Sequence, residues 1–289
     1  DNGVFEDYGL YTQVEQLNKT ALKTHGADPN GQLYKINSFE FLRYEDIIRL
    51  STDPAYDQTA FEARLEIKGD SDHSKLIEML EVLNDETSSM EDELFATYFD
   101  KENIAYWMAF QLLTGNTDTQ NRNVYLYSPQ NSSKWYLWDW DNDGMLRRRE
   151  REIIKFSDSE SWERGVSNYW GNVLFRRCLQ TQSYRDMLDA AMKELYAYMN
   201  EERIQSMLEH YRSVTETYVW QMPDRMYVPI THAEYEDVLK SIWPEIEENY
   251  NYYWESYHNP MPFYIGTPSL QNGVLQLSWD TSYDFNAED

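Results

Sequence analysis

Residues 112–123 read LLTGNTDTQNRN, and residues 124–141 read VYLYSPQNSSKWYLWDWD. Residues 124–127 and 135–138 are aromatic and apolar, and a polar segment at 128–134 separates them, which is typical of two strands joined in a hairpin. Antiparallel strands place the start of one beside the end of the other, so this hairpin brings Asn123 close to Asp139 and Asp141. The preceding residues predict a helix that leads to Gly115 and a loop that carries Asp118.

The order Asp118, four residues, Asn123, then Asp141 repeats the spacing of a protein kinase active site. There an aspartate accepts the proton of the substrate hydroxyl, and an asparagine and a second aspartate hold magnesium, which neutralises the phosphates. Other kinase motifs are absent from the sequence. No His-Arg precedes Asp118, no Phe-Gly follows Asp141, and there is no Gly-rich phosphate loop.

Several segments in the first half of the chain together resemble the CotH family of spore-coat protein kinases. They are GLYTQVEQ at 9–16, QLYK at 32–35, GNTD at 115–118, NVYLY at 123–127 and WDWD at 138–141. They occur in family order, and such an ordered set is more specific than any single motif. The second half of the chain resembles the family only loosely.

The resemblance implies an α+β, atypical protein-kinase-like fold, mostly the helical large lobe with part of the small lobe. It also implies transfer of a phosphoryl group from ATP, with Mg²⁺, to Ser or Thr of a secreted, surface or spore-coat protein. Asp118 would orient or deprotonate the hydroxyl, Asn123 and Asp141 would hold Mg²⁺, and Asp139 would bind the metal directly or support its ligands.

Three residues are candidates for nucleotide binding. In the resembled family an aromatic residue near the position of Trp135 stacks on adenine, although a core tryptophan is an equal alternative. Lys35, which follows Tyr34, would neutralise a phosphate, with an ordinary surface lysine as the alternative.

A calcium-binding loop is the rival interpretation of the same acidic residues. The pattern D-x-[DN]-x-[DN]-G-x5-E is complete, with Asp139, Asp141, Asp143, Gly144 and Glu150. Its flanks disagree, because an EF-hand loop follows an amphipathic helix whereas residues 134–138 are strand-like. Arginines at 147–149 would also place three cations within the loop. Magnesium is therefore the preferred metal and calcium the alternative.

Composition limits the class of partner. The chain has 51 acidic and 25 basic residues in 289, a formal net charge of −26, which repels nucleic acid and anionic membranes and attracts a basic polypeptide. That suits a basic, Ser-rich protein substrate, although acidity also serves solubility alone. The single cysteine, Cys178, excludes a disulfide within the chain, and no apolar run reaches membrane-spanning length. An extracellular, cell-surface or spore-coat location follows from the resemblance, and the oligomeric state stays open.

Two regions are expected. Residues 1–260 form the kinase-like domain, with a strand at Gly9–Glu15 and helices after Asn18, Ser74 and Asp100 and at 184–195, 203–218 and 235–254. Residues 261–289 contain an Asn272-Gly273 turn and begin a β-sandwich-like module. The family's first small-lobe strands are expected to precede Gly9 and to be missing here. A non-catalytic adhesion or scaffold module with the same fold is therefore the alternative function.

Overall fold

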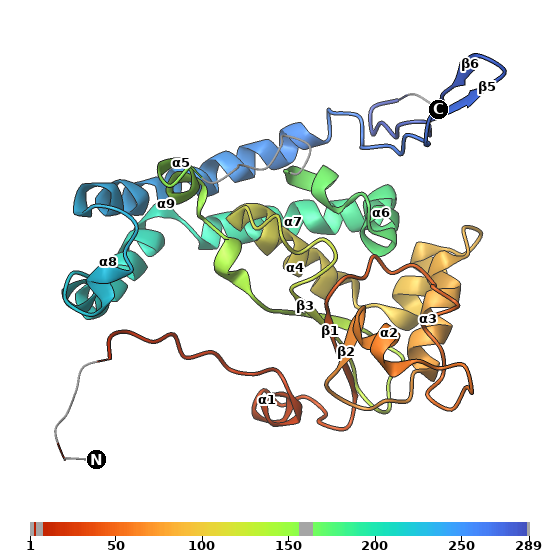
Figure 1. Ribbon diagram of the computed structural model, residues 1–289, viewed down its shortest axis with the longest axis horizontal. Coiled ribbons are helices and arrows are strands. Elements are labelled where there is room, and N and C mark those ends of the chain that lie inside the picture. The colour runs from red at the N-terminus through yellow and green to blue at the C-terminus, as the bar shows by residue number, and fades with distance from the viewer. Residues whose placement is uncertain (1–2, 4–7, 156–163, 288–289) are drawn as a thin grey trace.

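A computed structural model of the protein describes residue 3 and residues 8–155 and 164–287 (Figure 1). Helices and a small antiparallel sheet share one continuous core, so the expected mixed α+β class is confirmed. The helices gather mainly on one side of the sheet, while α1 lies on the other (Figure 1).

The main sheet has four strands in the order β2-β1-β3-β4. The strands are β1 (Gln32–Ile36), β2 (Leu65–Ile67), β3 (Val124–Ser128) and β4 (Tyr136–Asp139). The expected hairpin is confirmed, because β3 and β4 pair antiparallel with Val124 opposite Asp139. Alternate residues face opposite sides, so Tyr34 and Ile36 enter the main core while Leu33 joins a second cluster on the other face.

The described residues form nine α-helices. They are α1 (Lys19–Thr24), α2 (Gln58–Glu62), α3 (Ser74–Asn84), α4 (Lys101–Thr114), α5 (Arg148–Ile153), α6 (Val173–Gln180), α7 (Gln182–Tyr198), α8 (Glu201–Val219) and α9 (His232–Ser256). The other helical segments are the π-helix η1 (Met90–Tyr98) and the 3₁₀ helices η2 (Asn142–Gly144), η4 (Gly165–Tyr169) and η5 (Asp224–Met226). The side chains of Asn18 and Asp100 accept backbone N–H groups at the starts of α1 and α4, as expected from the sequence.

Helix α4 is the central element. It contacts β4, α7 and α9, and its residues Ile104, Met108 and Leu113 are fully buried. Gly115 ends it in the left-handed region at φ 65°, where glycine is favoured because it has no Cβ. A helix packed on all sides thus gives the following loop a fixed origin.

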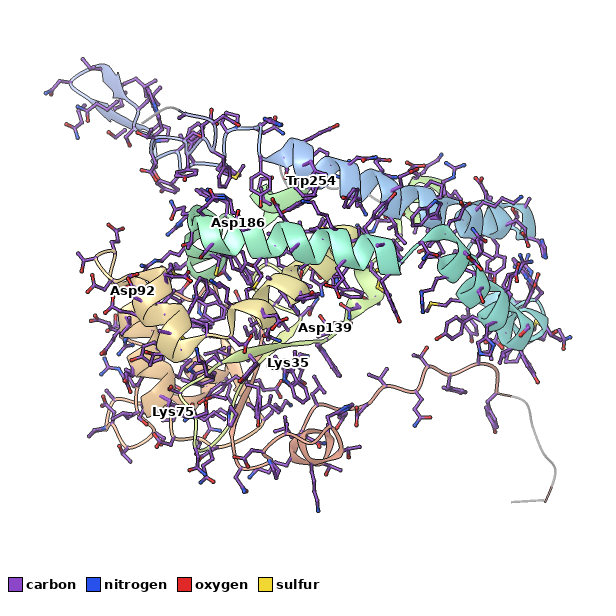
Figure 2. The ribbon with its side chains drawn as sticks, turned by 180° about the vertical axis from the view of Figure 1, so that it is seen from behind. Lys35, Lys75, Asp92, Asp139, Asp186 and Trp254 are labelled. Atoms are coloured by element: carbon purple, nitrogen blue, oxygen red, sulfur yellow. The ribbon has the colours of Figure 1, made fainter. Side chains whose placement is uncertain are left out.

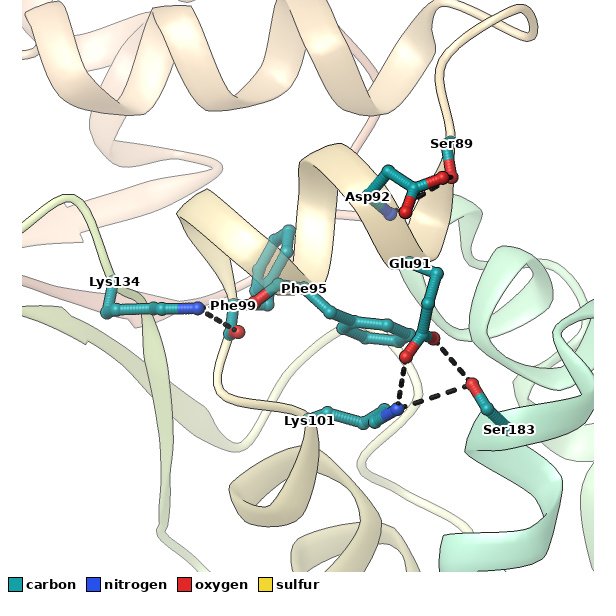
Figure 3. A network of polar contacts seen from close by, with 8 residues as sticks. All are labelled: Ser89, Glu91, Asp92, Phe95, Phe99, Lys101, Lys134 and Ser183. Atoms are coloured by element: carbon teal, nitrogen blue, oxygen red, sulfur yellow. Dashed lines mark hydrogen bonds and ion pairs between the residues drawn. The ribbon is translucent and has the colours of Figure 1, made fainter.

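A polar network fixes the start of α4 (Figure 3). Lys101 Nζ lies 2.7 Å from Glu91 Oε1 of η1 and 3.3 Å from Ser183 Oγ of α7, and Ser183 also donates to Glu91. Lys134, just before β4, donates to the carbonyl oxygens of Phe95 and Phe99. Helix α4 and the approach to β4 are therefore both tied to η1.

The expected strand at Gly9–Glu15 is wrong. These residues belong to neither sheet and run across the surface toward η5, where the backbone N–H of Leu10 donates to the carboxylate of Asp224 at 3.0 Å. An alternating sequence becomes a strand only where another strand accepts its backbone hydrogen bonds.

The C-terminal residues form a small hairpin, β5 (Ser269–Gln271) and β6 (Val274–Gln276), which projects beyond the helices (Figure 1). Asn272 and Gly273 turn it with φ of 51° and 77°, as the Asn-Gly pair predicts. Leu275 and Trp279 are exposed, whereas Tyr283 packs on Trp170 of the helical body. The β-sandwich-like module at 261–289 stays a prediction.

His73 occupies a fully buried aromatic cage. Its Nδ1 lies 2.8 Å from Tyr34 Oη and its Nε2 3.2 Å from Tyr56 Oη, and its ring stacks on Phe61 at 4.1 Å between centroids. Burial lowers the pKa of His73 to about 4, although Asp72 and Asp70 oppose the shift.

Because this pKa lies below its unfolded value, His73 stays neutral in the folded protein and the unfolded chain takes up the proton first. Folding stability is therefore complete above pH about 6.5 and falls as the pH drops toward 4, with a loss of about 2–3 kcal/mol between pH 7.5 and pH 4.5 from this residue. Urea unfolding at the two pH values should show a smaller loss in His73→Gln than in the parent. The exposed-histidine variant His210→Gln should behave like the parent, and equal pH dependence in all three would contradict the cage argument.

Candidate active site

The loop after α4 brings Asp118 and Asn123 into direct contact. Asn123 Nδ2 donates to Asp118 Oδ2 at 3.0 Å, and Arg122 Nε donates to Asp118 Oδ1 at 2.6 Å. The first bond orients the asparagine so that its amide oxygen is left as an acceptor. Two of the predicted site residues are thus neighbours, and Arg122, which the sequence argument did not select, holds one of them.

Asp139 lies at the end of β4 and reaches back to α4. Gln111 Nε2 donates to Asp139 Oδ1 at 2.8 Å, while Gln111 Oε1 accepts from Asn116 Nδ2 at 2.9 Å. Desolvation raises the pKa of the Asp139 carboxyl, and the hydrogen bond from Gln111 opposes that rise. Hydrogen bonds therefore join the end of the hairpin to the loop that carries Asp118.

Gln111 and Asn116 belong to the candidate site and were not selected from the sequence. Both are almost fully buried and both also approach the side chain of Asn142, at 3.3 Å and 3.4 Å. The usable signal was Gln111, a polar residue on the same helical face as Met108 and the other apolar core positions. A buried amide on an apolar helix face needs hydrogen-bond partners, and the partners of Gln111 are residues of the candidate site.

Asn123 and Asp141 share an unusual backbone conformation. Their φ angles are 56° and 58°, in the left-handed region where Asn and Asp are enriched among non-glycine residues. Asp141 is exposed at the exit of the hairpin, and Asp139 sits opposite Val124, the neighbour of Asn123. Such conformations cluster at functional sites, where surrounding structure holds them.

Lys35 is near this end of the sheet but not bonded to the predicted metal ligands. It pairs in register with Tyr125 on β3, and its Nζ lies 5.6 Å from the centroid of the Trp140 ring, between Asp139 and Asp141 in sequence. Figure 2 shows Lys35 and Asp139 from the side of the sheet. The lysine is half-buried on the face away from α4, where it places a positive charge close to the acidic strand end.

Tyr34 and Trp135 do not lie where a nucleotide could reach them. Both are fully buried, their rings stack on each other at 6.2 Å between centroids, and Tyr34 Oη is bonded to His73. The adenine-stacking role for Trp135, and the binding role for Tyr34, are therefore corrected to core packing. The cause is strand alternation: Trp135 and Leu137 point into the core, and Trp138 points to the other face.

The calcium-loop alternative lacks its geometry. A strand rather than a helix leads into the loop, and Arg147 occupies the Glu150 carboxylate through bonds of 2.7 Å and 3.2 Å. Within the described residues, the acids of the loop do not converge on one point as a cage would require. The structure therefore argues against the calcium-loop interpretation.

In the described part of the chain, one group of carboxylates and imidazole does converge: Glu216, His232 and Glu236, whose candidate ligand atoms lie within 4.8 Å of one another. Arg212 already bonds to both carboxylates, at 3.1 Å to Glu216 and 2.5 Å to Glu236. The guanidinium of Arg212 thus supplies, between α8 and α9, the positive charge that a metal ion would otherwise bring to these two carboxylates.

Helix α9 contacts the base of the Asp118 loop. Asn249 Nδ2 donates to the carbonyl of Leu113 at 3.2 Å, and a Cβ placed on Gly115 would come within 2.7 Å of the same nitrogen. From η4, Asn168 Nδ2 donates to the carbonyl of Thr117 at 3.3 Å. The loop is held by segments far apart in sequence.

Comparison with known proteins gives one family. The sequence model described as CotH kinase protein matches residues 2–253, which include every site residue discussed above. No curated protein matches the chain. Among the described residues, no helix combines the length and apolar composition needed to cross a bilayer.

Proposed function

This chain belongs to the CotH kinase family, and from that premise we propose that it transfers the γ-phosphoryl group of ATP to Ser or Thr hydroxyls of a protein substrate. The observation that carries the proposal is the 3.0 Å bond between Asn123 and Asp118, at the end of the hairpin where Asp139 and Asp141 emerge. Asp118, the proposed proton acceptor, lies on the loop after α4, and the proposed oxygen donors Asn123, Asp139 and Asp141 flank the paired end of the β3–β4 hairpin.

The donor set fits a hard divalent cation. Asn123 offers its amide oxygen, and Asp141 offers an exposed carboxylate, while Asp139 is held by Gln111 and acts directly or by supporting its neighbours. A bound Mg²⁺ would neutralise the charge that develops on the transferred phosphoryl group. Lys35 adds a further positive charge beside the strand end.

In the proposed reaction, the substrate Oγ attacks the γ-phosphorus and the bond to the bridging oxygen of ADP breaks. The hydroxyl proton passes to a carboxylate oxygen of Asp118, which Arg122 and Asn123 hold in place. ADP and the phosphorylated side chain leave. The protein substrate would be basic, because the net charge of −26 attracts cations, and membership of the family supports a Ser-rich chain at a cell surface or in a spore coat.

A non-catalytic adhesion or scaffold role is the second candidate. Its support is the projecting β5–β6 hairpin, whose exposed apolar side chains are available for contact with another surface, together with the burial of Tyr34 and Trp135. Nothing in this role would require the bond between Asn123 and Asp118.

The test is phosphate incorporation from ATP and Mg²⁺ into a basic and an acidic peptide of equal serine content. We expect labelling of the basic peptide with a Michaelis constant that rises with salt, because the Debye length shrinks from about 30 Å at 0.01 M to about 8 Å at 0.15 M. Equal labelling of both peptides at low salt would assign the −26 charge to solubility. Failure to label either peptide would favour the scaffold role.

A further inference from the structure

A cavity of about 110 Å³ opens beside the Asp118 loop. Its floor includes Asn116 and Thr117, which lead directly into Asp118, and its other walls come from α5, η4 and α9. The predicted ligands Asn123, Asp139 and Asp141 do not line it. A space of this size holds several waters or one compact group of a ligand.

The cavity is positively charged in a strongly acidic protein. Its charged lining residues are four arginines, Arg147, Arg148, Arg151 and Arg164, and one glutamate, Glu245. The chain has only 25 basic residues against 51 acidic ones, yet four guanidinium groups and one carboxylate line this cavity; Glu150 and Glu248, which do not line it, pair with three of the four arginines. An anion is repelled by most of this surface and attracted here.

The arginines differ in what they already bind. Arg148 is structural, since its backbone N–H donates to the buried Glu245 at 3.2 Å and its side chain pairs with Glu248. Arg147 pairs with Glu150 at the rim, and Arg151 Nη2 is 3.5 Å from the carbonyl of Gly144.

Arg164 comes from a separate segment, where its guanidinium lies over the ring of Tyr252 at 4.6 Å and pairs with Glu248 at 3.2 Å. Guanidinium groups from two segments therefore line the same cavity, as in sites where arginines bind a phosphate from two sides.

We propose that this cavity binds a phosphorylated side chain of the protein substrate, close to the hydroxyl that receives the next phosphoryl group. The inference rests on the proposed kinase function and adds a specificity site to it. A phosphoserine carries about −1.5 to −2 charges and three acceptor oxygens, which suits several guanidinium donors better than a single carboxylate does. Because the cavity adjoins the Asp118 loop, the phosphoserine and the acceptor serine are close neighbours in the substrate chain.

The consequence is successive phosphorylation of clustered serines. The first transfer leaves a phosphoserine, and that group then anchors the same substrate while the neighbouring hydroxyl reaches Asp118. A basic Ser-rich substrate would still be attracted by the acidic surface. The phosphoserines that accumulate on it would bind only at the arginine cavity.

The experiment measures peptide binding without nucleotide. Three basic fluorescent peptides of the same sequence would carry Ser, phosphoserine or Glu beside the acceptor serine. We expect the phosphoserine peptide to bind about tenfold more tightly than the Ser peptide, with the Glu peptide in between. The double variant Arg147→Gln/Arg151→Gln and the single variant Arg164→Gln, on separate segments, should each reduce that preference.

Arg149→Gln is the matched control. It removes one charge from the same arginine run, but Arg149 pairs with Asp237 and Glu152 and does not line the cavity. This variant should keep the phosphoserine preference. Equal binding of the three peptides by the parent, or equal loss of preference in Arg149→Gln, would overturn the inference.

Competition with ATP tests whether the cavity binds the phosphates of the nucleotide instead of a phosphoserine. Displacement of the phosphoserine peptide by ATP, with ATP affinity lost in Arg147→Gln/Arg151→Gln, would assign the cavity to the nucleotide and overturn the inference. If the protein binds the phosphoserine peptide tightly but transfers phosphate to no peptide, the kinase function is rejected and the cavity is a site that only binds phosphoserine.

Discussion

Asp118→Asn is expected to lower phosphoryl transfer by about 10²–10⁴-fold while leaving nucleotide binding close to that of the parent. The substitution keeps the size of the side chain and an oxygen that accepts from Asn123 or Arg122, so the loop should keep its shape. It removes the group that takes the hydroxyl proton. Single-turnover transfer to a basic serine peptide, and calorimetric titration with ADP and Mg²⁺, measure the two effects separately.

The control for this variant is Asp186→Asn. Asp186 lies on α7, where it accepts from Gln182 at 2.7 Å, and the same charge is lost there without contact with the loop (Figure 2). Its transfer rate should equal that of the parent. Turnover by Asp118→Asn within about twofold of the parent rate, well inside the range expected for loss of a base, would place the proton acceptor elsewhere.

Asp141→Asn should weaken nucleotide binding in Mg²⁺ by roughly 10- to 100-fold, because the phosphates lose a charged link to the protein. Asparagine is the suitable replacement, since position 141 has φ 58° and asparagine tolerates the left-handed region where most residues are strained. Binding without a divalent ion should change little.

Asp143→Asn provides the comparison for Asp141→Asn. It lies two residues further along the same loop, is also exposed, and loses the same charge. Magnesium-dependent nucleotide binding should survive in this variant. Equal losses in the two variants would indicate a diffuse electrostatic effect, and high calcium affinity without nucleotide, lost in either variant, would restore the calcium-loop interpretation.

Local signals account for what the sequence predicted well. The β3–β4 hairpin follows from two aromatic segments separated by a polar turn, and Asp100 caps α4 because its side chain accepts a nearby N–H group. The contact between Asn123 and Asp118 lies within six residues. These features need only neighbours in sequence, so they could be read from it.

Other features depend on distant partners. Among the described residues no strand pairs with Gly9–Glu15, so the strand expected there does not form. Of the two alternatives for Trp135, adenine stacking and core packing, the structure has core packing, because strand alternation buries Trp135 together with Leu137. The arginine cavity joins residues 147–151 to Arg164 and α9, and no periodic pattern connects them. Convergence of this kind is decided by packing, which single-sequence patterns do not encode.

The support of the Asp118 loop by α9 bears on modularity. The recognisable motifs end by residue 141, as if the first half of the chain could form the site alone. In the structure, however, two residues of α9 support it: Asn249 contacts the turn at Gly115, and Glu245 accepts a hydrogen bond from the start of α5. Asn249 and Glu245 are more than a hundred positions away from the Asp118 loop along the chain. A fragment ending before α9 would keep the diagnostic motifs and lose the scaffolding that shapes them. The smallest unit that preserves the candidate site therefore extends through α9.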